Sequence, residues 1–443
     1  MLQVRMHRPL TASRGARPFW FQMPMLLAAV VLLAVLAMST SPSAAGSWKG
    51  QEVTKEGVLH IMNPAEGMEA STSVELTELW RLGGDTEDEE EFFGVIAQIK
   101  TDPRGNLYVL DSQLSEVKIY DANGEYLNSI GREGEGPGEF RRPNDMFFMP
   151  DGDIGVMQSI PGKIVTLTPE GDPAGDFPLP TPEGGGFQML RGGRTADNHL
   201  VLARQLQAFE EGKVSQTISL DKVDMEGNIE HTYLTNERVL DFANFVIDEK
   251  RFFTFEQQGR WDVGKDGRVY VLNDYVDYVI TVYNADGSLD RKIRREYEHR
   301  KRTAKEIETI EKIWEAFLRQ APNAKTDIGD LDYDVQAIYP RDDGSLWVLT
   351  SYGARDLPDG VLGVFDVFDD QGHYVRQVTL EGQGDPQEDG YFFVGDRLYV
   401  VTGWLDAVVA QQGGTEGAEE EEEAMPMELI CYRVDAPVIA KGE

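Results

Sequence analysis

A short unit built around two tight turns recurs along the chain and constrains its fold more than any other feature. In its clearest copy the turn Asp102–Gly105 precedes the apolar run Leu107–Leu110, and a second turn, Asp121–Gly124, separates two further strands. Proline fixes φ in the first turn and glycine tolerates positive φ, while a run that is apolar on both faces predicts a strand buried on both sides. The unit is therefore expected to be a small antiparallel sheet.

Both turns can be counted along the chain. The first turn, with glycine or a turn-prone substitute two residues before an apolar strand, recurs at Gly105, Gly152, Asn198, Gly267, Gly344 and Asp396. The second turn places Asp, Asn or Thr three residues before a glycine, at Gly124, Gly171, Gly227, Gly287 and Gly372. Six first turns and five second turns predict six sheets, the last of which runs out of chain before its outer strand.

The missing outer strand has a candidate near the start of the chain. Residues 73–82 alternate apolar and polar side chains and have no glycine turn of their own. Pairing them beside Cys431–Asp435 would cover the open edge of the last sheet and close a ring. The sequence thus predicts an all-β fold, a six-bladed β-propeller over residues 73–438, with residues 46–72 as an N-terminal linker.

The link after the first unit carries a resemblance to a known family. Residues 131–140 are GREGEGPGEF, followed by Pro143, and this resembles the G-x-G-x-G-P-G-E-F link of the NHL-type six-bladed propellers. Tyr108–Ser112 and Ile119–Gly124 resemble the rest of that repeat. The resemblance implies the fold but not the function, because proteins of this superfamily range from lyases and lactonases to protein- and RNA-binding scaffolds.

The first 45 residues are expected to be a signal peptide. A basic region precedes the apolar run Met25–Met38, and Ser43 and Ala45 are the small residues of a cleavage site after Ala45. The alternative is an uncleaved membrane anchor, because the apolar stretch extends back through Phe19–Phe21 to about 20 residues. In both cases the rest of the chain is expected to be extracytoplasmic, either periplasmic or secreted.

Composition limits the partners. The formal net charge is −35, which repels nucleic acid and anionic lipid headgroups and favours cations or basic partners. We therefore expect no nucleic-acid partner, and contact with a membrane only through an N-terminal anchor. The single cysteine, Cys431, lies in an alternating strand and is expected to be a buried apolar residue.

The order of strands separates the loops of the ring into two ends. The two turns join strands one to two and three to four, so they share one end, the turn end. Connections between strands two and three, and between blades, share the other, the insertion end. All long insertions fall there, with two acidic runs, Asp85–Glu91 and Glu419–Glu423; the insertions are Gln205–Lys213, Thr235–Gln258, Glu296–Asp330, Tyr352–Gly360 and Trp404–Pro426. Because loops carry function on a rigid scaffold, the insertion end is the predicted working face.

The insertion over residues 296–330 is predicted to be helical. Apolar residues recur at spacings of three and four within Glu306–Gln320, and the basic segment Arg291–Arg302 precedes them. We expect this helix to pack on the ring, with its basic lead-in paired to acidic loops. A lid over the central channel is the alternative.

Polar and aromatic residues that should face the channel mouth are candidate ligand contacts: Asp111, Gln158, Arg204, Asp274, Tyr352 and Trp404. The leading hypothesis is an exported binding or scaffold module, without a cofactor, that engages a protein, peptide or small molecule through its acidic loop face. The alternative is a divalent-metal-dependent hydrolase or lyase resembling the lactonase-type propellers. In that case Ca²⁺ or another divalent cation would be held by Asp111, Asn273 or Asp274, since hard cations bind oxygen ligands.

Overall fold

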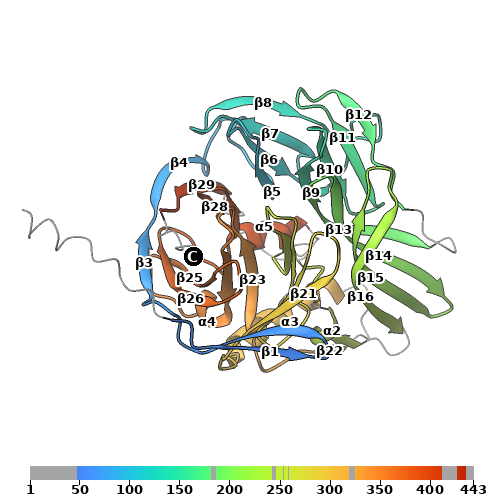
Figure 1. Ribbon diagram of the computed structural model, residues 1–443. Coiled ribbons are helices and arrows are strands. Elements are labelled where there is room, and N and C mark those ends of the chain that lie inside the picture. The colour runs from blue at the N-terminus through green and yellow to red at the C-terminus, as the bar shows by residue number, and fades with distance from the viewer. Residues whose placement is uncertain are drawn as a thin grey trace, which may run out of the picture. The chain divides into compact units, whose positions relative to one another are not determined.

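The computed structural model describes residues 47–180, 186–241, 246–252, 254–257, 259–318, 325–411 and 427–435. From residue 48 onward these residues form a ring of six blades (Figure 1), as the repeat count predicts. The predicted signal segment, residues 1–45, and the acidic run at 419–423 lie outside the described residues. Within the described ranges, no helix has the length and apolar character needed to cross a bilayer.

Blades one to three are four-stranded antiparallel sheets. Their strands are β5 (Ile96–Thr101), β6 (Leu107–Asp111), β7 (Glu116–Tyr120) and β8 (Tyr126–Ile130) in blade one; β9 (Pro143–Phe148), β10 (Ile154–Gln158), β11 (Lys163–Leu167) and β12 (Pro173–Asp176) in blade two; and β13 (Phe187–Ala196), β14 (His199–Glu210), β15 (Lys213–Val223) and β16 (Ile229–Asp241) in blade three. The strands of blade three are long, so part of the insertion predicted after residue 205 is a continuous hairpin.

Blades four to six include strands from the start of the chain. Their other strands are β18 (Trp261–Val263), β19 (Val269–Val271), β20 (Val279–Tyr283) and β21 (Leu289–Arg295) in blade four; β23 (Val335–Pro340), β24 (Leu346–Thr350), β25 (Val361–Phe368) and β26 (Tyr374–Glu381) in blade five; and β27 (Gly390–Val394), β28 (Arg397–Val401) and β29 (Glu428–Arg433) in blade six.

Residues 51–83 form a strap along the outer edges of these three blades, in blue in Figure 1. The strap contains β1 (Gln51–Lys55), β2 (Val58–Asn63), β3 (Thr72–Glu75) and β4 (Thr77–Gly83). β2 pairs in parallel with β21 of blade four, β3 in parallel with β26 of blade five, and β4 antiparallel with β29 of blade six. Residues 46–72 are therefore not a bare linker: a parallel partner more than 200 residues away leaves no local turn signal.

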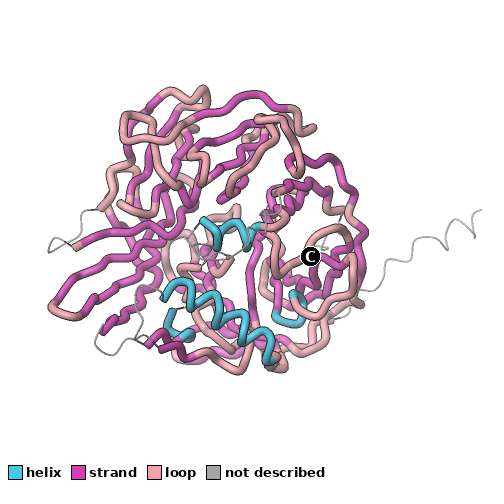
Figure 2. Tube along the Cα trace, turned by 180° about the vertical axis from the view of Figure 1, so that it is seen from behind, coloured by secondary structure: helices cyan, strands magenta, loops and turns pink. Residues whose placement is uncertain are grey.

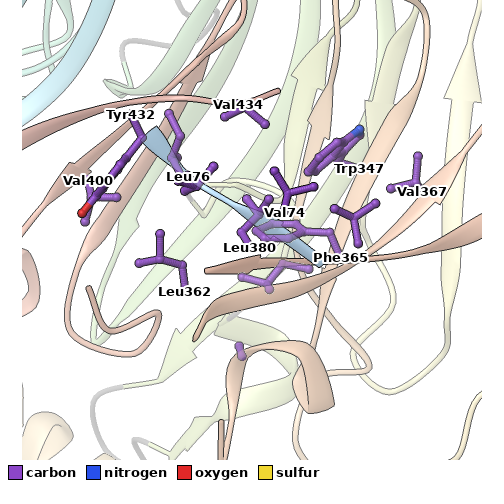
Figure 3. Close-up of a cluster of buried hydrophobic side chains, with 14 of the residues drawn as sticks. Val74, Leu76, Trp347, Leu362, Phe365, Val367, Leu380, Val400, Tyr432 and Val434 are labelled. Carbon is purple, nitrogen blue, oxygen red and sulfur yellow. The ribbon is translucent and has the colours of Figure 1, made fainter. Parts of the chain in front are cut away.

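The predicted ring closure is confirmed. Trp80 lies opposite Cys431, in the register that joins the start and the end of the propeller. The strand expected over residues 73–82 is, however, divided at Leu76, so that its first half extends blade five and only its second half closes blade six. Leu76 and Val74 pack among side chains of blades five and six, as Figure 3 shows.

The turns explain why glycine recurs at fixed positions. Gly124 has φ +87°, and its amide donates to the carbonyl of Asp121 at 3.1 Å, a geometry repeated in the other second turns. Two of the predicted first turns differ by one residue: the left-handed positions are Asp197 (φ 51°) and Gly395 (φ 57°), not Asn198 and Asp396. Positive φ is accessible to glycine and tolerated by aspartate, so both substitutes satisfy the same turn.

The Gly-rich link between blades one and two is shaped by a buried ring. Phe140 is fully buried, and a Cβ added to Gly131, which has φ +78°, would lie 2.4 Å from its ring. Glu139 accepts hydrogen bonds from the Arg132 side chain at 2.7 Å and the Gly136 amide at 2.8 Å. The spacing of glycine, glutamate and phenylalanine in this link is thus a packing requirement.

The helices gather at the insertion end, as Figure 2 shows from behind. They are α2 (Glu249–Phe252), α3 (Ala304–Leu318), α4 (Ser351–Ala354) and α5 (Trp404–Gln411). α3 is the helix predicted over residues 306–320, whose last two residues lie outside the described residues. The Trp314 ring of α3 contacts Phe252 of α2 at 6.2 Å, and β17 (Val246–Asp248) pairs in parallel with β22 (Lys325–Asp327).

A buried ion-pair network, here the cap network, fastens these insertions together. Arg302 donates to both carboxylate oxygens of Glu249 at 2.8 Å, and the two side chains are 2% and 3% exposed. Asp332 Oδ2 lies 3.5 Å from Arg300 and 3.2 Å from Arg355, and Arg300 also pairs with Asp356 at 2.7 Å. Arg300 and Arg302, at the end of the basic lead-in, are therefore paired with Asp356 and Glu249 of neighbouring insertions and not with the acidic run at 85–91.

Candidate functional site: the central channel

Asp111, one of the two candidates common to both functional hypotheses, holds a loop. Its side chain is fully buried, and its two oxygens accept hydrogen bonds from the amides of Gly94 at 2.7 Å, Leu114 at 2.8 Å, Gln113 at 2.9 Å and Val95 at 3.2 Å. Burial raises the pKa of Asp111, and these amides oppose the rise. Because the Asp111 carboxylate accepts four hydrogen bonds from backbone amides, its role is to stabilise the loops on either side of it.

Gln158 and Arg204 also act within their own blades. Gln158 accepts from the Arg141 amide at 2.9 Å and donates to the Ile160 carbonyl at 3.2 Å. Arg204 donates from two nitrogens to Asp221 at 2.7 Å, and both residues are buried. Neither side chain lines a cavity at the axis.

The proposed metal ligands do not gather. Asn273 Oδ1 accepts from Asn236 at 2.9 Å, and the neighbouring Asp274 is exposed. Its carbonyl, not its carboxylate, accepts from the buried Arg260. In the part of the chain that the structure describes, no three His, Cys, Asp or Glu side chains are arranged to hold a metal ion.

The two aromatic candidates have different surroundings. Tyr352 is 49% exposed at the start of α4, with its ring 5.8 Å from that of Tyr297. Trp404 begins α5, and its indole Nε1 donates to the Ile96 carbonyl at 2.9 Å, which ties blade six to blade one. Of the six candidates, only Trp404 lines the central cavity.

That cavity has a volume of about 250 Å³ and runs between the innermost strands. It extends from Trp404 and Asp389 at the insertion end to Lys100 and Val394 toward the turn end. Blades one, three, four, five and six all contribute to its lining. α5 lies beside its insertion-end mouth, near the centre of the ring in Figure 2.

One wall of the channel is polar and continuous across four blades. Gln98 of blade one donates to Asp145 of blade two at 2.8 Å. Arg194 of blade three pairs with Asp145 at 2.9 Å and with Asp262 of blade four at 2.7 Å. The guanidinium of Arg194 also lies 5.2 Å from the centre of the Trp261 ring, a cation–π distance.

Lys100 adds an amine to this wall. It follows Gln98 by two residues on β5, so both side chains point to the same face of the strand and line the cavity. Burial lowers the pKa of Lys100, and the positive charge of Arg194 lowers it further, against the opposing charges of Asp262 and Asp145.

The opposite wall is aromatic. Tyr339 of blade five and Phe393 of blade six line the cavity with ring centres 4.8 Å apart. Tyr391 also lines it, but its hydroxyl donates to the Leu362 carbonyl at 2.9 Å and is occupied. The channel therefore offers hydrogen-bonding and charged groups on one side and ring faces on the other, the combination typical of small-molecule sites.

None of the polar-wall residues is among the sequence-predicted candidates, which were expected to follow the second strand of each blade. Gln98, Lys100, Arg194 and Asp262 all lie on first strands. A signal was present, because each interrupts a strand of the innermost layer with a charge or an amide. Such residues face either the channel or the next blade, and the sequence does not show which.

Comparison with known proteins agrees with the fold. A family model described as DUF5128, 6-bladed beta-propeller, matches residues 66–181. The chain folds as a six-bladed β-propeller. The NHL type inferred from residues 131–140 stays a prediction. No curated protein matches.

Three solved structures illustrate the likeness. A member of the duf4221 family from Bacteroides vulgatus is 11% identical with TM-score 0.46, over 81% of this chain and 97% of that one. A luciferin-regenerating enzyme is 12% identical with TM-score 0.39, over 79% and 96%. Virginiamycin B lyase from Staphylococcus aureus is 11% identical with TM-score 0.35, over 79% and 98%. At these identities the likeness does not extend to chemistry.

Proposed function

We propose that this protein is an exported propeller that binds a small organic molecule in its central channel. The observation that supports this most directly is the cavity of about 250 Å³ with one polar and one aromatic wall. A ligand with a polar end and an apolar or aromatic body would satisfy both walls at once. The basic and apolar segments that precede residue 46 support the proposed export.

The ligand enters from the insertion end. Trp404 and Asp389 lie at that mouth, and the acidic segment 85–91 connects β4 to β5 at the same end. At this mouth Trp404 donates to the Ile96 carbonyl at 2.9 Å, and Asp389 accepts from the Gly403 amide at 2.9 Å. A scaffold function remains the second proposal, in which a protein or peptide partner would bind to the surface of the insertion end.

Thermal unfolding of the mature chain with a panel of aromatic acids, aldehydes and amines tests the proposal. A ligand specific for the native state raises the midpoint, by an amount that grows with its concentration over its Kd. We expect such a rise in the wild type and in Tyr352→Ala, whose exposed ring lies at the same end outside the cavity. The rise should disappear in Trp404→Ala. Equal rises in all three proteins would place binding outside the channel and refute the proposal.

A further inference from the structure

Lys100 differs from every other charged group of the channel wall. Arg194 has two carboxylate partners, Asp145 and Asp262, at 2.9 and 2.7 Å. Within the described ranges, Lys100 makes no direct hydrogen bond or ion pair, although its side chain lines the same cavity. A lysine that only stabilised the fold would be expected to meet a carboxylate here, since two are close by.

Both carboxylates are engaged by Arg194 instead of Lys100. Asp145 Oδ2 accepts from Arg194 and from the Gly193 amide at 2.9 Å, and Asp145 Oδ1 accepts from Gln98. Asp262 Oδ1 accepts from Arg194 at 2.7 Å. Lys100 is thus left beside a second cation in a partly buried site, an arrangement that favours the neutral, nucleophilic amine.

The surroundings suit a carbonyl compound. Tyr339 and Phe393 form an apolar wall across the cavity, which can hold the body of an aldehyde or ketone. Asp262 lines the cavity too, and its second oxygen has no partner within the described residues, so it is placed to move a proton.

We propose that Lys100 is a nucleophilic amine that condenses reversibly with an aldehyde or ketone bound in the channel. This rests on the proposed function and names its ligand class. The Nζ lone pair forms a bond to the carbonyl carbon, and the C–O π electrons move to the oxygen, which takes a proton. The nitrogen loses one proton to give a carbinolamine, the hydroxyl takes a second proton and leaves as water, and the resulting iminium nitrogen loses its remaining proton, so that a neutral C=N bond remains. Amine and carbonyl together give imine and water, with no oxidant or reductant consumed.

The test is reductive trapping of the wild-type protein. Benzaldehyde is added with sodium cyanoborohydride near neutral pH, and benzylated lysines are quantified by peptide mass spectrometry over time. Lys265, exposed in a turn, serves as the internal reference. We expect Lys100 to be modified at least about tenfold faster than Lys265, since a lysine with a lowered pKa has more free amine. Equal or slower modification of Lys100 overturns the proposal.

Lys100→Arg, together with the Trp404→Ala variant introduced above, separates this proposal from the binding function. Lys100→Arg keeps the cation but cannot form an imine. The aldehyde concentration needed for a given rise of the unfolding midpoint should therefore increase at least about tenfold, while the rise caused by an aromatic acid is retained. If both shifts are retained and Lys100 is not trapped, the channel binds ligands and the imine proposal fails alone. If Lys100 is trapped rapidly but every ligand raises the unfolding midpoint of Trp404→Ala as much as that of the wild type, the proposal of binding in the channel fails alone.

Discussion

Two clusters of buried charge, the cap network and the polar wall of the channel, are built on different rules. In the cap network Arg302 meets both oxygens of Glu249, which also accepts from the Tyr275 hydroxyl and the Gly329 amide. In the polar wall Arg194 uses both nearby carboxylates, and Lys100 is left without a direct partner. Every charged side chain named in the cap network has an oppositely charged partner, whereas Lys100, at a cavity, has none among the described residues. The first arrangement is expected of a cluster that holds the fold, and the second of one that holds a ligand.

The comparison is tested most severely at Arg302. Arg302→Met would leave the Glu249 carboxylate buried and uncompensated, so the free energy of unfolding should fall by about 3 to 5 kcal/mol. Urea unfolding followed by circular dichroism measures it. Lys312→Met, which removes an exposed pair with Glu308 in α3, is the control and should change stability by less than about 0.5 kcal/mol. Equal effects would show that the cap network does not hold the insertions.

Arg194 should matter less. Arg194→Met leaves Asp145 without its cation, but Gln98 and the Gly193 amide still donate to it, and the Asp262 side chain is 30% exposed. We expect a loss of about 2 to 3 kcal/mol in the same assay. Arg191→Met, whose side chain pairs with Gln205 instead of a carboxylate, serves as the matched control. A loss larger than that of Arg302→Met would reverse the ranking of the two clusters.

A third ion pair, which joins the half-exposed His299 to the buried Asp334, gives a pH dependence. His299 Nδ1 lies 3.0 Å from both oxygens of Asp334; the hydrogen bond to Asp334 raises the pKa of His299, and burial raises the pKa of Asp334 to about 6. The folded pair therefore holds its protons more tightly than the unfolded chain. Its contribution to stability is present at acidic pH and is lost as pH rises through about 6 and the raised pKa of His299.

Comparison of wild type with Asp334→Asn checks this. Between about pH 8 and pH 5 the unfolding free energy of the wild type should rise relative to the variant by roughly 1 to 2 kcal/mol. Relative to His299→Gln, the unfolding free energy of the wild type should also rise as the pH falls over this range. Parallel pH profiles for wild type and Asp334→Asn would contradict the shifts and leave the pair without a role in pH dependence.

Lys100 should give the smallest effect on stability. Lys100→Met leaves no partner unpaired, so the unfolding free energy should change by less than about 0.5 kcal/mol. In the same protein the aldehyde concentration needed for a given thermal shift should rise at least about tenfold, as in Lys100→Arg. A large loss of stability would show that Lys100 belongs to the structural class represented by Arg302.

The fold was accessible from the sequence because its signal is local. Each blade is recognisable in the sequence by a tight turn next to a buried strand. The open edge of the strand that contains Cys431 required a partner, and the strand that contains Trp80 provides it. The pairing of β2 with β21 was not accessible, because parallel strands far apart share no turn. For the same reason the break at Leu76 could not be placed.

The candidate site was less accessible. Asp111 follows a buried strand in a position that suits a ligand contact and a loop fastener equally, and only the four amides around it decide between them. Lys100 lies within a strand whose other residues are mostly apolar. Its lack of an ion-pair partner depends on the pairing of Arg194 with Asp145 and Asp262. Such relations among blades are set by closure of the ring, not by neighbours in the chain.

The strap also fixes an order of assembly. Its strands meet partners at successively later positions, β2 at residues 291–295, β3 at 378–381 and β4 at 428–433. During synthesis the beginning of the chain would wait, then fasten onto blades four, five and six in turn as each emerges from the ribosome. The ring would close progressively through blades four and five, and the last pairing, of β4 with β29, would form only when the final strand is available.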